Sequence, residues 1–210
     1  MRLTLLSLLL AGFSISCLAQ QWEIGGAAGY GWPLEASVTG APNPFHAGFP
    51  ARAAFGVMWD ENMYNYIGGE FQYLFRLGGS QLRSNGITES ASGYSNILVY
   101  NLMIHMKPRE SKFRPFVAAG AGIRIFTNSS TLVPQPLLTT AVLTQGTQVQ
   151  PAVSFDGGIK YMLPRHVQLR LDLRVFTSPA PNDLIRTVGA SRLRGWLYDL
   201  MPMAGVAYVF

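Results

Sequence analysis

Charged side chains at alternate positions are the residues in this sequence whose spacing could support chemistry. In the stretch VQLRLDLRVF, from Val167 to Phe176, the residues Arg170, Asp172 and Arg174 are each separated by one position. Side chains two positions apart in a strand share a face, so these groups could line an ion path or pair with charges on other strands. The positions between them are Leu or Val. The stretch therefore predicts a strand with one polar and one aliphatic face.

Two histidines, His46 and His105, are the candidates for catalysis. A hydrolytic site would need a histidine positioned beside a serine and an acid. The spacing of the sequence identifies no such group. We therefore predict that the protein is not an enzyme and has no catalytic, cofactor-binding or metal residues, and we keep a lipid-modifying enzyme at the rim as the less favoured alternative.

The composition favours a protein for which lipid is part of the solvent. Charged residues make up 13% of the 210 residues, and hydrophobic residues make up 49%. This is little charge for a soluble domain. After the N-terminus no run of eighteen apolar residues occurs, which excludes a bundle of transmembrane helices and leaves a β-barrel as the spanning structure. The net charge of +5 is scattered along the chain, so we expect no nucleic-acid partner.

The first residues are typical of an export signal. Arg2 precedes an apolar segment that extends from Leu3 to Phe13, and Ala19 ends a run of small residues. We predict that residues 1–19 are a cleaved signal peptide and that residues 20–210 form the barrel domain. Lipidation of Cys17 is the alternative, and ordinary cleavage would leave a mature chain without cysteine.

Alternation and turn residues predict eight strands. They are Trp22–Trp32, Ala51–Asp60, Tyr64–Leu77, Tyr94–Met106, Pro115–Phe126, Pro151–Met162, Val167–Phe176 and Trp196–Phe210. Each charged residue in them falls on the non-aliphatic side of its own strand. The predicted connections alternate between short ones (61–63, 107–114, 163–166) and long ones (33–50, 78–93, 127–150, 177–195), as periplasmic turns and extracellular loops would.

Aromatic residues near the strand ends predict two interfacial girdles. Those expected toward the turns are Trp22, Trp59, Tyr161 and Tyr208, and those expected toward the loops are Trp32, Phe75, Phe126 and Trp196.

The polar faces predict a lumen charge network. Its expected members are Arg52, Glu70, Arg76, Arg124, Asp156, Lys160, Arg170, Asp172, Arg174 and Asp199, with Glu23 and Asp60 on the same faces. The interior of an eight-stranded barrel is only wide enough for side chains to fill it, so a salt-bridged plug is favoured over an ion path.

Two of the long loops suggest surface contacts. The 127–150 segment has no charged residue, and its alternation from about Thr140 predicts a protruding hairpin whose free edge could add a partner's strand. A mobile loop is the alternative. Arg186, Arg192 and Arg194 could contact lipopolysaccharide phosphates or could simply be solvated.

The C-terminal residues MAGVAYVF, with Val206, Tyr208 and Phe210 on one face, are similar to the signal read by the barrel assembly machinery. RPFVAAGAGIRIF and SFDGGIKYMLPRHVQLRLDLR also look like pieces of this family. From Trp22 to Phe210 the chain resembles the OmpA-like and OmpX-like eight-stranded outer-membrane barrels. The resemblance implies an up-and-down antiparallel transmembrane barrel in the outer membrane of a Gram-negative cell envelope.

The resulting prediction is a monomeric barrel of structural or adhesin-like type with a plugged polar lumen. Its expected partners are outer-membrane lipid, lipopolysaccharide, the assembly machinery and an extracellular partner at the 127–150 hairpin. A narrow, porin-like channel and a soluble lipocalin-like barrel with its apolar faces inward remain as alternatives.

Overall fold

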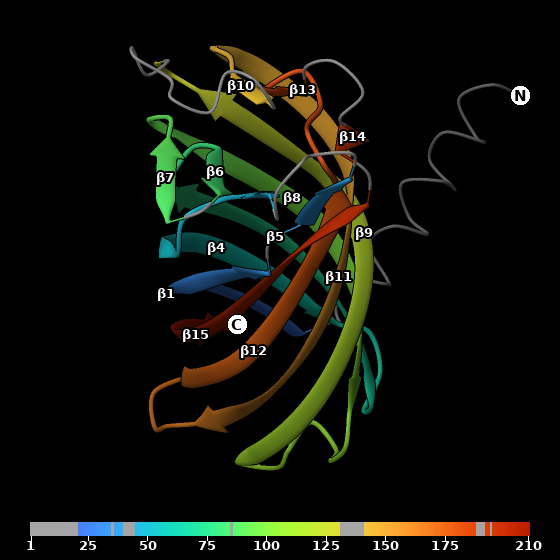
Figure 1. Ribbon diagram of the computed structural model, residues 1–210. Coiled ribbons are helices and arrows are strands. Elements are labelled where there is room, and N and C mark those ends of the chain that lie inside the picture. The colour runs from blue at the N-terminus through green and yellow to red at the C-terminus, as the bar shows by residue number, and fades with distance from the viewer. Residues whose placement is uncertain are drawn as a thin grey trace, which may run out of the picture.

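The computed structural model describes residues 21–34, 36–39, 45–84, 86–130, 141–187, 192–193 and 195–210, so the predicted signal peptide lies outside the described residues. Eight long strands close into one antiparallel barrel (Figure 1). They are β1 (Gln21–Leu34), β4 (Arg52–Asn62), β5 (Ile67–Leu77), β8 (Gly93–His105), β9 (Phe113–Asn128), β11 (Gly146–Met162), β12 (Val167–Pro179) and β15 (Trp196–Val209). Each strand pairs with the next along the chain, and β15 pairs with β1, so the predicted meander is confirmed.

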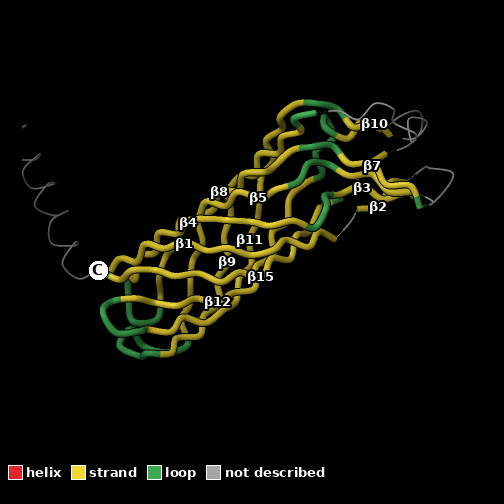
Figure 2. The backbone as a smooth tube through the Cα atoms, turned by 90° about the vertical axis from the view of Figure 1, so that its left-hand side faces the viewer, coloured by secondary structure: helices red, strands yellow, loops and turns green. Residues whose placement is uncertain are grey.

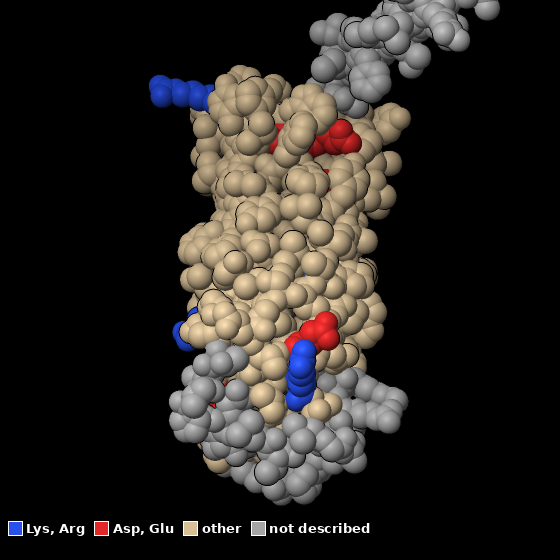
Figure 3. All heavy atoms as spheres, turned by 90° about the horizontal axis from the view of Figure 1, so that it is seen from above, with Lys and Arg blue, Asp and Glu red and all other residues tan. Residues whose placement is uncertain are grey.

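The strands of the barrel alternate between an apolar outer face and a polar inner face. In β12, Leu171 is 55% exposed on the outer wall, whereas the neighbouring Arg170 is 2% exposed. The middle of the wall in Figure 3 is free of acidic and basic atoms, which appear only toward the two ends. Within the described ranges no helix is long and apolar enough to cross a membrane. The predicted faces are confirmed, and the lipocalin-like alternative, which needs apolar faces inward, is wrong.

The two ends of the barrel differ. Three short connections, residues 63–66, 106–112 and 163–166, lie at one end, which we call the turn end. The other end, the loop end, carries seven short strands that the sequence analysis did not predict (Figure 2). They are β2 (Ala36–Thr39), β3 (Phe45–Gly48), β6 (Gln81–Ser84), β7 (Ile87–Ser90), β10 (Ala141–Leu143), β13 (Ile185–Thr187) and β14 (Arg192–Leu193). They pair between different loops, in the order β14-β2-β3-β6-β7 and as β10 with β13.

The hairpin of β9 and β11 extends farther toward the loop end than its neighbours. Its pairing begins at Gly146 with Asn128, whereas β12 joins β11 only from Val153 onward. Residues 131–140 lie outside the described residues. The alternation beyond Thr140 does not prolong β11 without a break, because Ala141–Leu143 forms β10 and pairs with β13.

The loop end has its own apolar core beneath the short strands. Phe49 and Phe126 stack there with ring centroids 4.9 Å apart, and both are buried. The placement of Phe126 in the outer girdle was wrong, because Phe126 has the inward parity of Arg124. The other expected girdle residues Trp32, Trp59, Tyr161, Trp196 and Tyr208 are exposed on the wall, and Trp22 and Phe75 are partly exposed.

The predicted third strand began too early. Tyr64 donates its backbone N–H to the carbonyl of Ile67 at 2.9 Å, so residues 64–66 form a turn and β5 begins at Ile67. The other seven predicted strands differ from the observed ones only at their ends.

Candidate functional site: the lumen charge network

Buried charges of both signs fill the lumen in equal number. Six carboxylates and six cations of the barrel strands are each at most 6% exposed: Glu23, Asp60, Glu70, Asp156, Asp172 and Asp199, with Arg76, Arg114, Arg124, Lys160, Arg170 and Arg174. A buried charge without a partner is costly, so a lumen sealed from water needs this balance. The strands bring the groups together because alternate residues of each strand point to the barrel axis.

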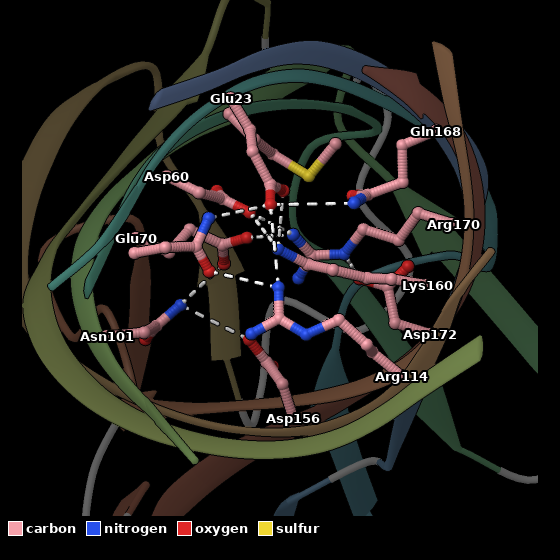
Figure 4. Close-up of polar contacts among 12 residues, drawn as sticks. Glu23, Asp60, Glu70, Asn101, Arg114, Asp156, Lys160, Gln168, Arg170 and Asp172 are labelled. Carbon is pink, nitrogen blue, oxygen red and sulfur yellow. Dashed lines mark hydrogen bonds and ion pairs between the residues drawn. The ribbon is translucent and has the colours of Figure 1, made fainter. Parts of the chain in front are cut away.

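Near the turn end, Lys160 joins two carboxylates from neighbouring strands (Figure 4). Its Nζ lies 2.6 Å from Glu23 Oε2 and 2.6 Å from Asp60 Oδ2. The amide of Asn62 donates to Glu23 Oε1 at 2.7 Å, and Arg114 Nη1 donates to Asn62 Oδ1 at 3.2 Å. These contacts tie β1, β4, β9 and β11 together across the lumen.

In the middle of the barrel, Arg170 is the hub of the network. Its guanidinium pairs with Glu70, lies 3.2 Å from Asp60 Oδ2 and donates through Nε to Asp172 at 3.1 Å. Arg174 pairs with the same Asp172 and lies 3.6 Å from Glu70 Oε1. Two cations from β12 are therefore shared among acids of β4, β5 and β12.

Asn101 extends this middle layer to the opposite wall. Its amide donates to Glu70 Oε1 at 3.0 Å and to Asp156 Oδ2 at 3.2 Å (Figure 4). Its carbonyl accepts a hydrogen bond from the hydroxyl of Ser154. Each of these two buried carboxylates thereby gains a hydrogen bond in place of water that it loses on burial.

Toward the loop end, Asp199 holds two arginines beneath an aromatic cap. Its carboxylate lies 2.5 Å from Arg124 Nη2 and 3.4 Å from Arg76 Nη2. The Phe49 ring covers both guanidinium groups, at 5.5 Å from Arg124 and 5.8 Å from Arg76, in cation–π geometry. Arg124 also lies 4.5 Å from the ring of Phe126. The chain between β3 and β4 thus closes the lumen.

Nine of the ten predicted network residues lie in the buried lumen, and Arg52 does not. Arg52 has the inward parity of β4, but it is the strand's first residue and its side chain is exposed at the loop end. Its placement in the buried network was wrong. Arg114 was not among the predicted network residues, because it was placed in the connection 107–114, whereas β9 begins at Phe113. Alternation with Phe116 and Ala118, which are also buried, could have revealed it.

The two histidines lie at opposite ends of the barrel. His105, at the end of β8, is buried and its ring centroid lies 6.2 Å from that of Phe116. Among the residues that the structure describes, neither of its ring nitrogens has a hydrogen-bond partner. His46 lies in β3 and pairs with Arg83 of β6 at the loop end. Within the described residues, no group of three His, Cys, Asp or Glu side chains is placed to hold a metal ion.

The remaining predicted contact residues lie on the surface or outside the described residues. Arg186 is exposed in β13, the backbone of Arg192 lies in β14, and Arg194 is outside the described residues. Val206, Tyr208 and Phe210 are 52%, 48% and 66% exposed on the outer wall at the turn end.

An apolar outer wall, a salt-bridged polar lumen and a closed eight-stranded meander together define a barrel of the outer-membrane type. Solved structures agree on the fold. The chain is similar to the outer membrane protein OprG from Pseudomonas aeruginosa, with 15% identity, a TM-score of 0.60, and coverage of 91% of this chain and 96% of that one. It is also similar to Neisserial surface protein A, with 12% identity, a TM-score of 0.57, and coverage of 90% of this chain and 96% of that one.

A third similar structure is the outer membrane protein AlkL in lipid bilayers, with 15% identity, a TM-score of 0.52, and coverage of 90% of each chain. The sequence matches no protein-family model and no curated protein. At these identities the likeness concerns the fold, and it confirms the predicted fold class, an all-β, eight-stranded antiparallel barrel.

Proposed function

We propose that the protein is an integral outer-membrane barrel of structural or surface-interaction type, with a lumen that does not conduct ions. The observation that carries this proposal is the lumen charge network, which links strands on opposite sides of the barrel. The apolar wall supports the membrane location, because in water it would leave residues such as Leu171, Val57 and Phe155 more than half exposed. Similar folds are found in Neisserial surface protein A and in the outer membrane proteins OprG and AlkL.

The packing of the lumen argues against the narrow-channel alternative. The gap between Glu23, Met58, Asp60 and Arg170 has no room for a water molecule. Ions could pass only if the pairs around Lys160 and Arg170 separated, and separating buried pairs is costly. The chemistry of the lumen is therefore that of a stabilising plug, and we assign no enzymatic role to the protein.

The loop end supplies the surface for contacts outside the cell. From Gly146 to Ala152, β11 pairs with β9 on one side, and within the described residues no strand pairs with its other side. There the backbone N–H of Asp183, in the loop after β12, donates to the side chain of Gln148 at 3.0 Å. A partner's strand could add to this edge. Arg186, with Arg192 and Arg194, is proposed to contact lipopolysaccharide phosphates.

Export and insertion belong to the same proposal. Residues 1–19 would act as the cleaved signal peptide, and the assembly machinery would recognise Val206, Tyr208 and Phe210. After insertion we expect the barrel to be a monomer, since its strands close on themselves and leave no edge within the wall.

Fractionation with a gel-mobility assay tests the proposal. The protein should sediment with the outer membrane, and unboiled samples should migrate faster than boiled ones, because the closed hydrogen-bonded wall resists detergent in the cold. Folding of the wild type in plain buffer without detergent or lipid would contradict the membrane assignment.

A further inference from the structure

Glu61 is a carboxylate on the outer wall. It is the penultimate residue of β4, next to the lumen-facing Asp60, and its side chain has the outward parity of Trp59. All other Asp and Glu residues of the barrel strands, within the described part of the chain, point into the lumen. An acid at this position faces the boundary between hydrocarbon and lipid headgroups at the turn end.

Four aromatic side chains surround Glu61. A hollow of about 310 Å³ on the outer wall is lined by Trp22, Trp59, Glu61, Phe71 and Tyr100. These residues come from the adjacent strands β1, β4, β5 and β8. The register places Trp22 beside Glu61 and places Trp59, Phe71 and Tyr100 in one row across three strands. The rings of Trp22 and Trp59 are 5.3 Å apart and tilted by 40°.

Gly69 makes room for the side chain of Tyr100 beside Glu61. It pairs with Glu61 on β4, and a Cβ at this position would lie 2.1 Å from the hydroxyl oxygen of Tyr100. Because Gly69 has no side chain, the Tyr100 ring can lean across β5 and donate its hydroxyl to Glu61 Oε1 at 3.0 Å. Among the residues that the structure describes, the polar contact of the Glu61 carboxylate is this hydrogen bond from a neutral hydroxyl, and no ion pair with a lysine or arginine is found for it.

We propose that this hollow binds the ammonium group of a phospholipid headgroup, of the ethanolamine type, in the leaflet at the turn end. A carboxylate supplies the opposite charge, and the faces of Trp and Tyr attract a cation through their quadrupoles, as in aromatic cages for organic ammonium ions. The hollow opens sideways into the membrane at headgroup level, where a lipid can place its ammonium in the hollow and its acyl chains along the exposed faces of Trp59 and Phe71. The inference rests on the membrane location proposed above.

Lipid retention measured by native mass spectrometry tests this inference. Wild-type protein is reconstituted in vesicles of equal phosphatidylethanolamine and phosphatidylglycerol, extracted, and analysed for bound lipid. We expect the ethanolamine lipid to be enriched by roughly fivefold, the size of a single cation–π contact or exposed ion pair. Glu61→Gln should abolish the enrichment. Glu110→Gln removes an exposed carboxylate from the β8–β9 connection, gives the same charge change and should preserve it.

Two further arms separate the possible outcomes. Gly69→Val should displace the Tyr100 ring and reduce the enrichment, whereas free ethanolamine at millimolar concentration should not compete. Competition by the free amine would show that the site binds a soluble ligand and would overturn the lipid assignment. Equal lipid retention by wild type and Glu61→Gln would overturn it as well.

Gel mobility of the same samples reports whether the protein has inserted. An inserted wild type without lipid preference refutes this inference alone, whereas failure to insert refutes the proposed function.

Discussion

At the scale of single residues, the lumen stability depends on partners rather than on individual charges. Arg170 contacts Asp60, Glu70 and Asp172. Each of these acids has one other cation, Lys160 or Arg174, so without Arg170 the three carboxylates would share only two cations. Replacing a whole buried ion pair by apolar groups can be harmless, but removing one partner leaves the other buried and unpaired. Substitutions that remove one charge should therefore be far more disruptive in the lumen than at its mouth.

Arg170→Met tests this difference. We expect it to lower the free energy of unfolding by about 3–5 kcal/mol, because three carboxylates lose a shared cation while the side-chain volume is roughly kept. Arg52→Met is the matched control, since Arg52 has the same parity but is exposed, and it should change stability by less than about 0.5 kcal/mol. Urea unfolding in lipid vesicles, followed by tryptophan fluorescence, measures both. Equal effects would contradict a buried network.

On the outer wall, adding a charge rather than removing one should destabilise the barrel. Leu171 is 55% exposed near the middle of β12, so it should contact lipid. Leu171→Arg should cost about 2–4 kcal/mol in vesicles, as expected for a cation near the midplane of a bilayer, whereas Leu171→Phe should be nearly silent. The same unfolding assay applies, and an Arg tolerated as well as Phe would mean that the wall does not face lipid.

At the scale of strands, alternation and turn residues predicted the eight barrel strands, because one face of each strand meets lipid and the other meets the lumen along its whole length. They failed where strands end or where pairing is non-local. Arg52 shares the inward parity but lies beyond the sealed part of the lumen. Arg114 lies within β9, which begins at Phe113, earlier than the turn-like residues before it suggested. The short strands of the loop end form only when distant loops meet, as when Ala141–Leu143 pairs with Ile185–Thr187, and no local pattern encodes such pairing.

The contrast between the two kinds of connection predicts an orientation. Asn182 is exposed at the loop end, and Glu110 is exposed in the connection between β8 and β9 at the turn end. A membrane-impermeant maleimide added to intact cells should label Asn182→Cys and spare Glu110→Cys. Both should react after the outer membrane is permeabilised, which controls for their accessibility. Labelling of Glu110→Cys alone in intact cells would show that the barrel is inverted.

At the scale of the whole molecule, three barriers lie in series along the lumen. The first is the Lys160 cluster near the turn end, the second is the layer around Arg170, and the third is the cap in which Phe49 covers Arg76 and Arg124. Because the barriers are stacked, an ion must pass all three, and the largest of them determines the resistance. Opening one layer leaves the other two in place.

This arrangement predicts how conductance responds to substitution. Wild-type protein in planar bilayers should give no steady current. Phe49→Ala removes only the aromatic cap, and Lys160→Ala combined with Asp60→Ala removes a cation and a carboxylate together from the turn-end cluster, so each variant should also remain closed while the Arg170 layer persists. Reproducible ion-selective openings of the wild type that change in the Lys160→Ala, Asp60→Ala variant would show that the charges line a path. In that case the narrow-channel function would replace the proposal of a plugged lumen, because ions would be passing between the ion pairs that are closed in the structure.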